Sequence, residues 1–207
     1  MTCAVVTTAL VARNQLFTAS APNQVLESDP VAVTGWAEYL KAGHRIGPVG
    51  AKFVLLEFAD FECPACREFA QKTLHELRDK YPQEIAVIFR HWPLPYHKFA
   101  IAAAIASECA ASQNKFVEFH DVVYRFQDSL GLKPLVEYAA AAGVADTAEF
   151  KRCALSPQAR NTVEADLKAA RQFGGSGTPT IGAGGVRYIG VPSLAELERA
   201  MRVTFSK

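Results

Sequence analysis

Two cysteines, Cys63 and Cys66, follow closely on a run of apolar residues that covers positions 53–58. A continuous apolar run of this length is typical of a β-strand that is buried on both faces. Residues 65–80 have a helical pattern, so the cysteines stand where a buried strand passes into a helix. The chain is therefore expected to adopt a fold that presents two thiols at a strand-to-helix junction.

The start of a helix is a favourable place for the thiolate of Cys63. Backbone N–H groups there have no partner within the helix, and the helix dipole adds partial positive charge. Pro64 suits the first helical turn, where its missing N–H is not needed. Cys66 follows one turn later and can close a small disulfide ring. We therefore expect Cys63 to form the mixed disulfide and Cys66 to resolve it.

A pair of cysteines with this spacing also occurs in sites of other kinds. Half of a zinc site is one alternative, but structural zinc needs four ligands, usually from two such pairs. The other cysteines are isolated in the sequence, and His91 and His97 lack the spacing of a zinc finger. We therefore predict no metal ion. An inert structural disulfide is the second alternative, which the strand-to-helix placement disfavours.

Glu57 and the Thr178-Pro179 pair add to the candidate site. Glu57 lies inside the apolar strand, where a carboxylate is costly, so its pKa should rise unless it is paired. A carboxyl group beneath the helix start can exchange a proton with Cys66. The alternative is that Glu57 points outward at a sheet edge. Thr178-Pro179 follows a glycine-rich turn and precedes a strand, and from these residues alone a trans proline is expected.

The remaining pattern predicts an α/β fold that a helical block interrupts. Residues 84–91 form a second strand, and the strand–helix–strand order indicates two parallel neighbours. Two short strands near residues 180–189 form a hairpin, so the sheet is mixed, and a capping box at 193–196 begins a final helix. The expected parts are a leader or mobile N-terminal segment (1–33), the first part of the fold (34–95), a helical insertion (96–173) and the second part of the fold (174–207).

Composition limits the function and the cellular compartment. The formal net charge of +1 is too balanced for a protein that mainly grips nucleic acid. The five cysteines leave at least one unpaired in any internal scheme, and a long-range structural disulfide would favour an oxidising compartment. Residues 3–12 are apolar and residues 18–21 are small, as in an export signal, but no basic residue precedes them. A remnant of an export signal and a plain mobile tail both stay open.

The segment Phe58–Cys66, followed much later by Gly177–Thr180, resembles the DsbA-like branch of thioredoxin-fold oxidoreductases. The resemblance covers about residue 34 to the end of the chain. It extends to further segments: Gly43–Gly47, Arg90–Leu94 with His97, and Asn114–Phe116 leading to Phe119–Asp121. It implies a thioredoxin fold, a mixed central sheet flanked by helices, with an inserted α-helical domain.

The resemblance also implies roles for individual residues. Thr178-Pro179 would be cis and pack beside Cys63, and the backbone of Thr178 would pair with an extended substrate peptide. The substrate would also meet Pro64 and Ala65, and Glu57 would be the buried acid of the family. Similar proteins sometimes carry a second disulfide in the insertion, so we expect Cys109 to pair with Cys153, with two separate reduced core cysteines as the alternative.

The implied activity is donation of a disulfide to reduced, unfolded exported proteins by a monomeric enzyme. A membrane partner would reoxidise it, in the periplasm or another extracytoplasmic place, and an N-terminal membrane anchor stays open. No organic cofactor is implied, because the electrons reside in the sulfurs. A reductase or isomerase with the same pair is one alternative, and a peptide-binding holdase with a vestigial disulfide is another.

Several neighbours of the motif carry expectations of their own. Strongly oxidising relatives often have a histidine between the two cysteines, which this chain lacks, and the charges of Asp60 and Glu62 should disfavour a thiolate. His97 is expected at the surface or at a cap, before a helix that begins near residue 98. The aromatic residues of the middle of the chain are expected to pack in the core: Trp92, Phe116, Phe119 and Tyr124.

Overall fold

The apolar run forms the strand β3, near the centre of a six-stranded sheet with the order β1-β6-β5-β3-β4-β2. The structure, a computed structural model, describes residues 30–206. The strands are β1 (Val31–Ala32), β2 (His44–Ile46), β3 (Phe53–Ala59), β4 (Ile85–His91), β5 (Thr180–Ala183) and β6 (Val186–Ile189). β3 and β4 are parallel and the other neighbours are antiparallel, so the predicted mixed sheet is confirmed.

A single helical stretch from Pro64 to Lys80 follows β3 and contains the predicted helix. It consists of α1 (Pro64–Glu68), a π-helical turn (Phe69–Thr73) and α2 (Leu74–Lys80). A short 3-10 helix (Trp36–Lys41) precedes β2 and another (Gln127–Ser129) follows α4. The other helices are α3 (Ala100–Ala111), α4 (Phe116–Arg125), α5 (Leu135–Ala141), α6 (Thr147–Ala154), α7 (Pro157–Gln172) and α8 (Leu194–Phe205).

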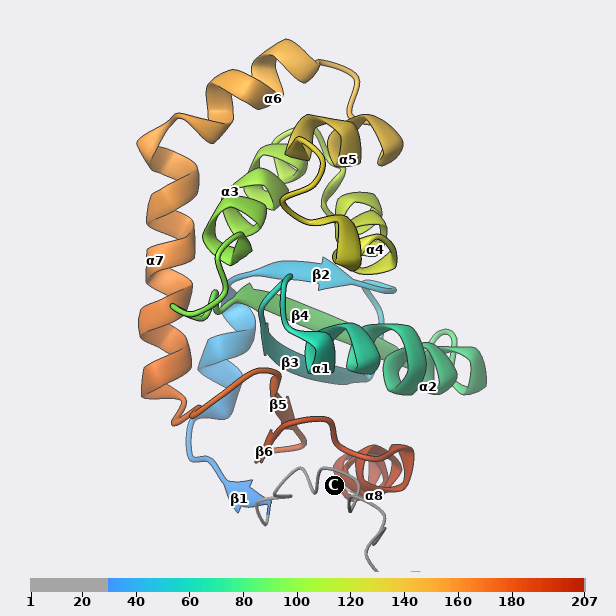
Figure 1. The fold of residues 1–207 in the computed structure, drawn as a ribbon. Coiled ribbons are helices and arrows are strands. Elements are labelled where there is room, and N and C mark those ends of the chain that lie inside the picture. The colour runs from blue at the N-terminus through green and yellow to red at the C-terminus, as the bar shows by residue number, and fades with distance from the viewer. Residues whose placement is uncertain (1–29, 207) are drawn as a thin grey trace, which may run out of the picture.

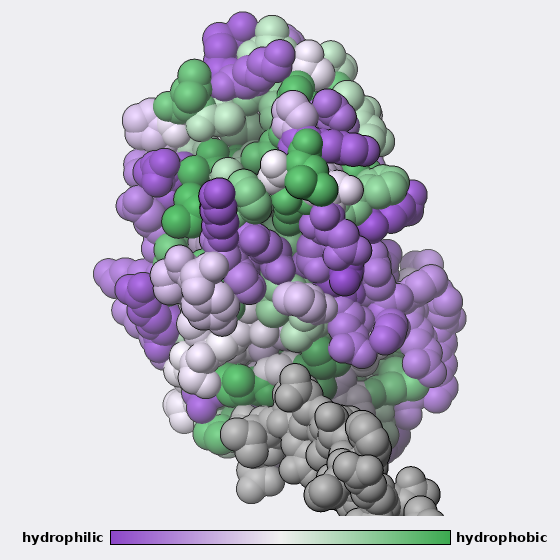
Figure 2. Space-filling model, in the orientation of Figure 1, coloured by the Kyte–Doolittle hydropathy of each residue, from purple (hydrophilic) through white to green (hydrophobic). Residues whose placement is uncertain are grey.

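The helical insertion, α3 to α7, lies between the two strand-bearing parts of the chain, as the sequence predicts. In Figure 1, α3, α4, α5 and α6 gather beyond β2, and α7 runs back along the sheet toward the hairpin. The surface in this view carries small groups of hydrophobic side chains between hydrophilic ones (Figure 2). None of the helices within residues 30–206 combines the length and hydrophobicity that a membrane span requires.

The two faces of β3 pack into different cores because side chains alternate along a strand. Leu55 and Ala59 join a large core that also includes Cys66 and Phe69 of the helix after β3. Glu57 lies between Leu55 and Ala59 on the same face of β3 and therefore faces this core. The opposite face of β3 packs against α7 through a second group: Leu56, Phe58, Ala170 and Phe173.

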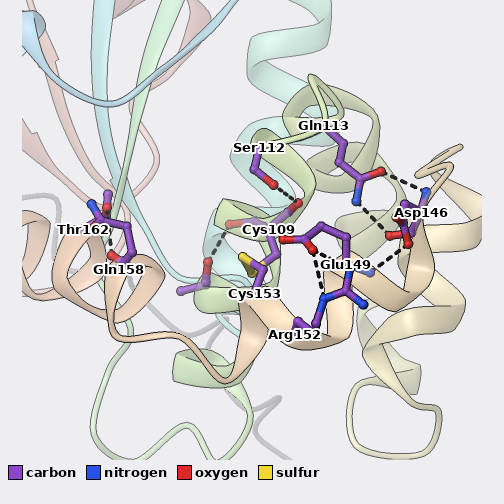
Figure 3. The surroundings of a disulfide bond; sticks show 11 residues. Cys109, Ser112, Gln113, Asp146, Glu149, Arg152, Cys153, Gln158 and Thr162 are labelled. Carbon is purple, nitrogen blue, oxygen red and sulfur yellow. Dashed lines mark hydrogen bonds and ion pairs between the residues drawn. A yellow bond between two sulfur atoms is a disulfide. The ribbon is translucent and has the colours of Figure 1, made fainter.

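A disulfide between Cys109 and Cys153 joins α3 to α6 within the insertion, and it is the pairing that the resemblance implies. The two Cα atoms are 5.6 Å apart and the bond spans 44 residues of sequence. A second link lies beside it, where the side-chain amide of Gln113 donates to the carbonyl of Asp146 and accepts from its N–H (Figure 3). These links hold two helices that are far apart in the chain.

The structure corrects two of the expected boundaries. Val31–Ala32 lies in the segment assigned to the leader, yet it pairs with Val186 and Arg187 of β6. Two residues are too few to show an alternating pattern, so the strand was not predicted. α3 begins at Ala100 rather than near residue 98. Residues 1–29, which include the possible export signal or anchor, lie outside the described part of the chain.

Candidate active site

Cys63 and Cys66 are both free thiols and stand at the start of α1. Cys63 occupies the N-cap position, with Pro64 exposed beside it at the first helical position. Cys63 keeps 7% of its surface exposed, whereas Cys66 has none. An incoming sulfur can therefore reach Cys63 and not Cys66.

The turn before β5 brings Thr178 and Pro179 to the attacking cysteine. Antiparallel pairing sets Thr180 of β5 opposite Phe58 of β3, and the sulfur of Cys63 lies 3.3 Å from the carbonyl oxygen of Thr178. The Thr178–Pro179 bond is cis, as the resemblance implies and contrary to the trans form expected from the local residues alone. Contacts with residues 115 positions away in the chain decide this geometry, which local sequence does not contain.

The surroundings of Cys63 lower its pKa from 9.0 to about 6. A hydrogen bond from the thiol of Cys66 is the largest cause, and burial opposes it. The side chain of Thr178 and the backbone N–H groups of Ala65 and Cys66 stabilise the thiolate further. Helix-start N–H groups thus act as predicted, while the strongest single contribution comes from the second cysteine.

Asp60 and Glu62 are not among the main causes that set the pKa of Cys63, which is lowered. The carboxylate of Asp60 is buried and accepts hydrogen bonds from the N–H groups of Glu62 and Leu94, both at 2.7 Å. His97 contacts the same carboxylate at 2.8 Å and is 17% exposed, so this histidine is partly buried against Asp60, and the N-cap of α3 is Phe99 instead. The carboxylate of Glu62 accepts from the N–H of Phe99. The carboxyl groups of Asp60 and Glu62 therefore bind backbone N–H groups of the segments around the site.

Cys66 and Glu57 favour their protonated forms because both are fully buried. Burial, together with the hydrogen bond to Cys63, raises the pKa of Cys66 well above 9.0, and the charge of Glu57 adds to the rise. Burial raises the pKa of Glu57 to about 8, and neither carboxyl oxygen has a hydrogen-bond partner among residues 30–206. β3 is an interior strand, so the alternative of an outward-pointing Glu57 is excluded.

Three groups that hold the site were not predicted as site residues. The N–H of Asp60 lies 3.4 Å from the sulfur of Cys66, and the hydroxyl of Tyr124 donates to the Asp60 carbonyl. The buried amide of Gln127 donates to the carbonyls of Phe61 and Cys63 at 2.8 and 3.0 Å. Tyr124 and Gln127 belong to the insertion, and no local motif near either one signals a contact with the cysteines.

The two histidines weighed as zinc ligands lie apart from the thiols. His97 is held by Asp60, and His91 contacts Glu108 at 2.8 Å. Trp92, Phe116, Phe119 and Tyr124 are buried, as predicted for packing residues. The arrangement at the cysteines is therefore a partly exposed, acidic thiol beside a buried, weakly acidic one, which is suited to thiol–disulfide exchange.

Comparison with known proteins places this geometry in a family. A family model described as Thioredoxin matches residues 40–202, which include both cysteines and Thr178-Pro179. The chain belongs to the thioredoxin family. Among thioredoxin-family structures, a thioredoxin-like oxidoreductase from Silicibacter pomeroyi superposes with a TM-score of 0.70 at 21% identity, covering 82% of this chain and 96% of that one.

Two further solved structures have the same fold. Pseudomonas aeruginosa DsbA2 gives a TM-score of 0.64 at 24% identity over 77% of this chain and 93% of its own. A periplasmic thioredoxin-like protein from Salmonella enterica serovar Typhimurium gives a TM-score of 0.64 at 23% identity, covering 79% of this chain and 90% of that one. The predicted thioredoxin fold with a helical insertion is thereby confirmed.

The curated relatives of this thioredoxin-family chain are longer proteins that are named Na(+)/H(+) antiporters. A protein from Salinispora tropica named Na(+)/H(+) antiporter NhaA 3 is 34% identical over 164 residues, which cover 79% of this chain and 25% of that protein. The chain thus matches about a quarter of the length of such relatives.

Proposed function

We propose that this protein is a thiol–disulfide oxidoreductase that works as a dithiol oxidase on exported proteins. The low pKa of Cys63, about 6, carries this proposal. Groups that stabilise the thiolate stabilise the reduced form of the pair, and a stabilised reduced form makes the disulfide a stronger oxidant. The absence of a histidine between the cysteines does not remove this effect, because Cys66 and backbone N–H groups supply the hydrogen bonds.

The proposed reaction begins with the Cys63–Cys66 disulfide. A substrate thiolate attacks the sulfur of Cys63, the bond between the two cysteines breaks, and Cys66 leaves as a thiolate. Glu57 is protonated at neutral pH, since its pKa is about 8, and can supply the proton that Cys66 takes up. A second substrate thiolate then attacks the substrate sulfur of the mixed disulfide and displaces Cys63. The substrate loses two electrons and the enzyme is left with two thiols.

The surface around Cys63 supports binding of an extended peptide. Pro64 is exposed and Ala65 partly so, and both stand beside the sulfur that is attacked. The carbonyl oxygen of Thr178 lies 3.3 Å from that sulfur. A substrate that runs past Thr178 as an added strand would bring its own sulfur to Cys63. Pro179 helps to set the position of Thr178, and its carbonyl accepts from the N–H of Gly190.

An extracytoplasmic location is part of the proposal. The Cys109–Cys153 disulfide favours an oxidising compartment, where such bonds persist. One protein of the same fold is described as periplasmic. In that compartment a membrane redox partner would reoxidise the thiols of Cys63 and Cys66. Antiporter activity is not proposed, because the chain matches only 25% of the antiporter from Salinispora tropica.

The decisive measurement is the reduction potential of the Cys63–Cys66 pair, found by equilibration in glutathione buffers and mass spectrometry of free thiols. We expect a potential clearly more oxidising than that of glutathione, above about −200 mV. A variant with serine at both positions serves as the control for thiols elsewhere in the chain. A potential at or below about −270 mV, that of thioredoxin, would overturn the oxidase assignment in favour of a reductase. A pair that never exchanges would support the holdase instead.

A further inference from the structure

Three side chains outside the thiol site converge where the sheet meets the helical insertion. His44 comes from the edge strand β2, His91 from the end of β4, and Glu108 from α3. The Nε2 atoms of His44 and His91 lie 2.5 and 2.8 Å from the same carboxylate oxygen, Oε1 of Glu108. The ligand atoms of all three residues lie within 4.8 Å of one another.

The cluster has a rigid apolar wall and one partly open side. The ring of His44 stacks on Phe116 with ring centres 3.8 Å apart, and the ring of His91 packs edge-on against Phe89. The side chain of His91 is 1% exposed, those of Glu108 and His44 11% and 22%. Packing therefore holds the two imidazoles with their Nε2 atoms toward one point that solvent can still reach.

We propose that His44, His91 and Glu108 form a binding site for a divalent transition metal ion, with Zn²⁺ as the best fit. Two imidazole nitrogens and one carboxylate oxygen are a set of three protein ligands that zinc accepts, with water as the fourth ligand. The partial exposure of His44 and Glu108 leaves access for that water. Nitrogen ligands disfavour Mg²⁺ and Ca²⁺, which prefer oxygen.

The position of the ligands in the fold gives the metal a structural role. The three residues come from three elements, and only Glu108 belongs to the insertion. A bound ion would therefore join the insertion to β2 and β4. The next residue after Glu108 is Cys109, whose disulfide joins α3 to α6. This inference concerns ligands distinct from the cysteines, so it does not depend on the proposed oxidase activity.

The test is a zinc titration of the full-length protein after treatment with a chelator. The Cys63–Cys66 pair is first oxidised so that its thiolates cannot bind the metal. We expect one Zn²⁺ per chain by calorimetry and by metal analysis after gel filtration. At a free zinc concentration near 100 times Kd, the melting temperature should rise by roughly 5–10 °C. Bound Co²⁺ should show the visible absorption of a four-coordinate site, and Mg²⁺ should not compete.

Variants of two of the three ligands test whether zinc binds at this cluster. His44→Ala and Glu108→Gln should each raise Kd for zinc by about 100-fold or more, since each removes a direct ligand. His75→Ala is the matched control, because His75 is an exposed histidine that pairs with Asp79 on its own helix. The Kd of this variant for zinc should equal that of the parent. No zinc binding by the parent, or equal binding in all the variants, would overturn the proposal and leave the cluster as a hydrogen-bonded link between sheet and insertion.

Discussion

Cys63 and Cys66 carry the same thiol group, but their pKa values shift in opposite directions because their surroundings differ. Cys63 is partly exposed and receives a hydrogen bond from the Cys66 thiol, so its pKa falls to about 6. Cys66 is enclosed in the core beside Glu57, so its pKa rises well above 9.0. At neutral pH the reduced Cys63 is therefore mainly a thiolate, while Cys66 keeps its proton.

The thiolate of Cys63 predicts a pH profile for alkylation of the reduced protein. The rate of modification of Cys63 by iodoacetamide, followed by mass spectrometry of its peptide, should rise with a midpoint near pH 6. In Cys66→Ala the main hydrogen bond is lost, so the midpoint should move upward toward 9.0. An unchanged midpoint in that variant would show that Cys66 does not stabilise the thiolate.

The same pKa shift predicts how the stability of the reduced protein depends on pH. The pKa of Cys63 is lower in the folded protein, about 6, than the ordinary value of 9.0. Its contribution to stability is thus present above pH 9.0 and is lost as the pH falls through about 6. The oxidised protein lacks this contribution, because a disulfide does not titrate.

The raised pKa of Glu57 predicts that stability falls as the pH rises, and this effect is best measured in the oxidised protein. Its pKa is raised from 4.5 to about 8, so folding favours its protonated form. The stability that Glu57 contributes is complete below pH 4.5 and is lost as the pH rises through about 8. At pH 7 this amounts to a loss of about 3 kcal/mol.

The variant Glu57→Gln tests this linkage because an amide does not titrate. Urea unfolding of oxidised parent and variant should be compared at several pH values between 5 and 8. We expect the stability difference between them to change by about 1.4 kcal/mol per pH unit, in favour of the variant as the pH rises. The variant should also exchange more slowly with substrate, because Cys66 loses its proton donor. Parallel stability curves would contradict the burial of an unpaired carboxyl at Glu57.

At the scale of elements, the helical insertion supports the active-site turn, and the side chain of Gln127 makes two of the contacts. The amide of Gln127 donates to the carbonyls of Phe61 and Cys63, which precede and begin α1. Backbone groups that are buried without partners are costly, so these bonds help to keep the turn closed. The insertion is thus part of the site and not only an addition to the sheet.

Replacing Gln127 by alanine should lower the stability of the oxidised protein by about 1–3 kcal/mol, because it removes the amide donor to the buried Phe61 carbonyl and one of the two donors to the Cys63 carbonyl. Gln113→Ala is the control, since Gln113 also bridges two segments, but at the protein surface. The Gln113→Ala variant should lose less than about 1 kcal/mol of stability. Equal losses in urea unfolding would mean that Gln127 contributes no more than a surface hydrogen bond.

Removing the disulfide between α3 and α6 should lower the stability of the protein by more than the loss of Gln127 does. Closing a loop of 44 residues stabilises the fold by about 4 kcal/mol if the bond acts through the entropy of the unfolded chain. The comparison should be made with serine at Cys63 and Cys66, so that only this bond can change. Cys109→Ala with Cys153→Ala should then lower the urea midpoint strongly, and reduction of the parent should have a similar effect. A loss below about 1 kcal/mol would show that helix packing alone holds the insertion.

At the scale of the whole molecule, the candidate site is assembled from segments that are far apart in the chain. β3 and α1 supply Glu57 and the cysteines, the turn before β5 supplies Thr178, and the insertion supplies Gln127. Pairing of β5 with β3 brings the first two together, and packing of the insertion brings the third. The same packing joins the cluster of His44, His91 and Glu108.

The parts of the fold with strong local patterns could be predicted from the sequence. The apolar run marked β3, the cysteine pair marked the helix start, and the capping box at Ser193 and Glu196 marked α8. The two glycines between β5 and β6 have positive φ angles, +59° and +90°, which is the backbone of a tight hairpin. The strands β1 and β2 escaped prediction because two or three residues carry too little pattern.

The sequence by itself determined the chemistry of this protein, because two cysteines at a strand-to-helix junction and an acid inside a buried strand act through local rules. Only the tertiary structure decided which groups surround them. The cis bond at Thr178-Pro179, the turning of the Asp60 carboxylate to His97, and the contact of Gln127 with Cys63 all depend on packing between distant segments. Local residue order carries propensity and charge, whereas distances between segments arise only when the core forms.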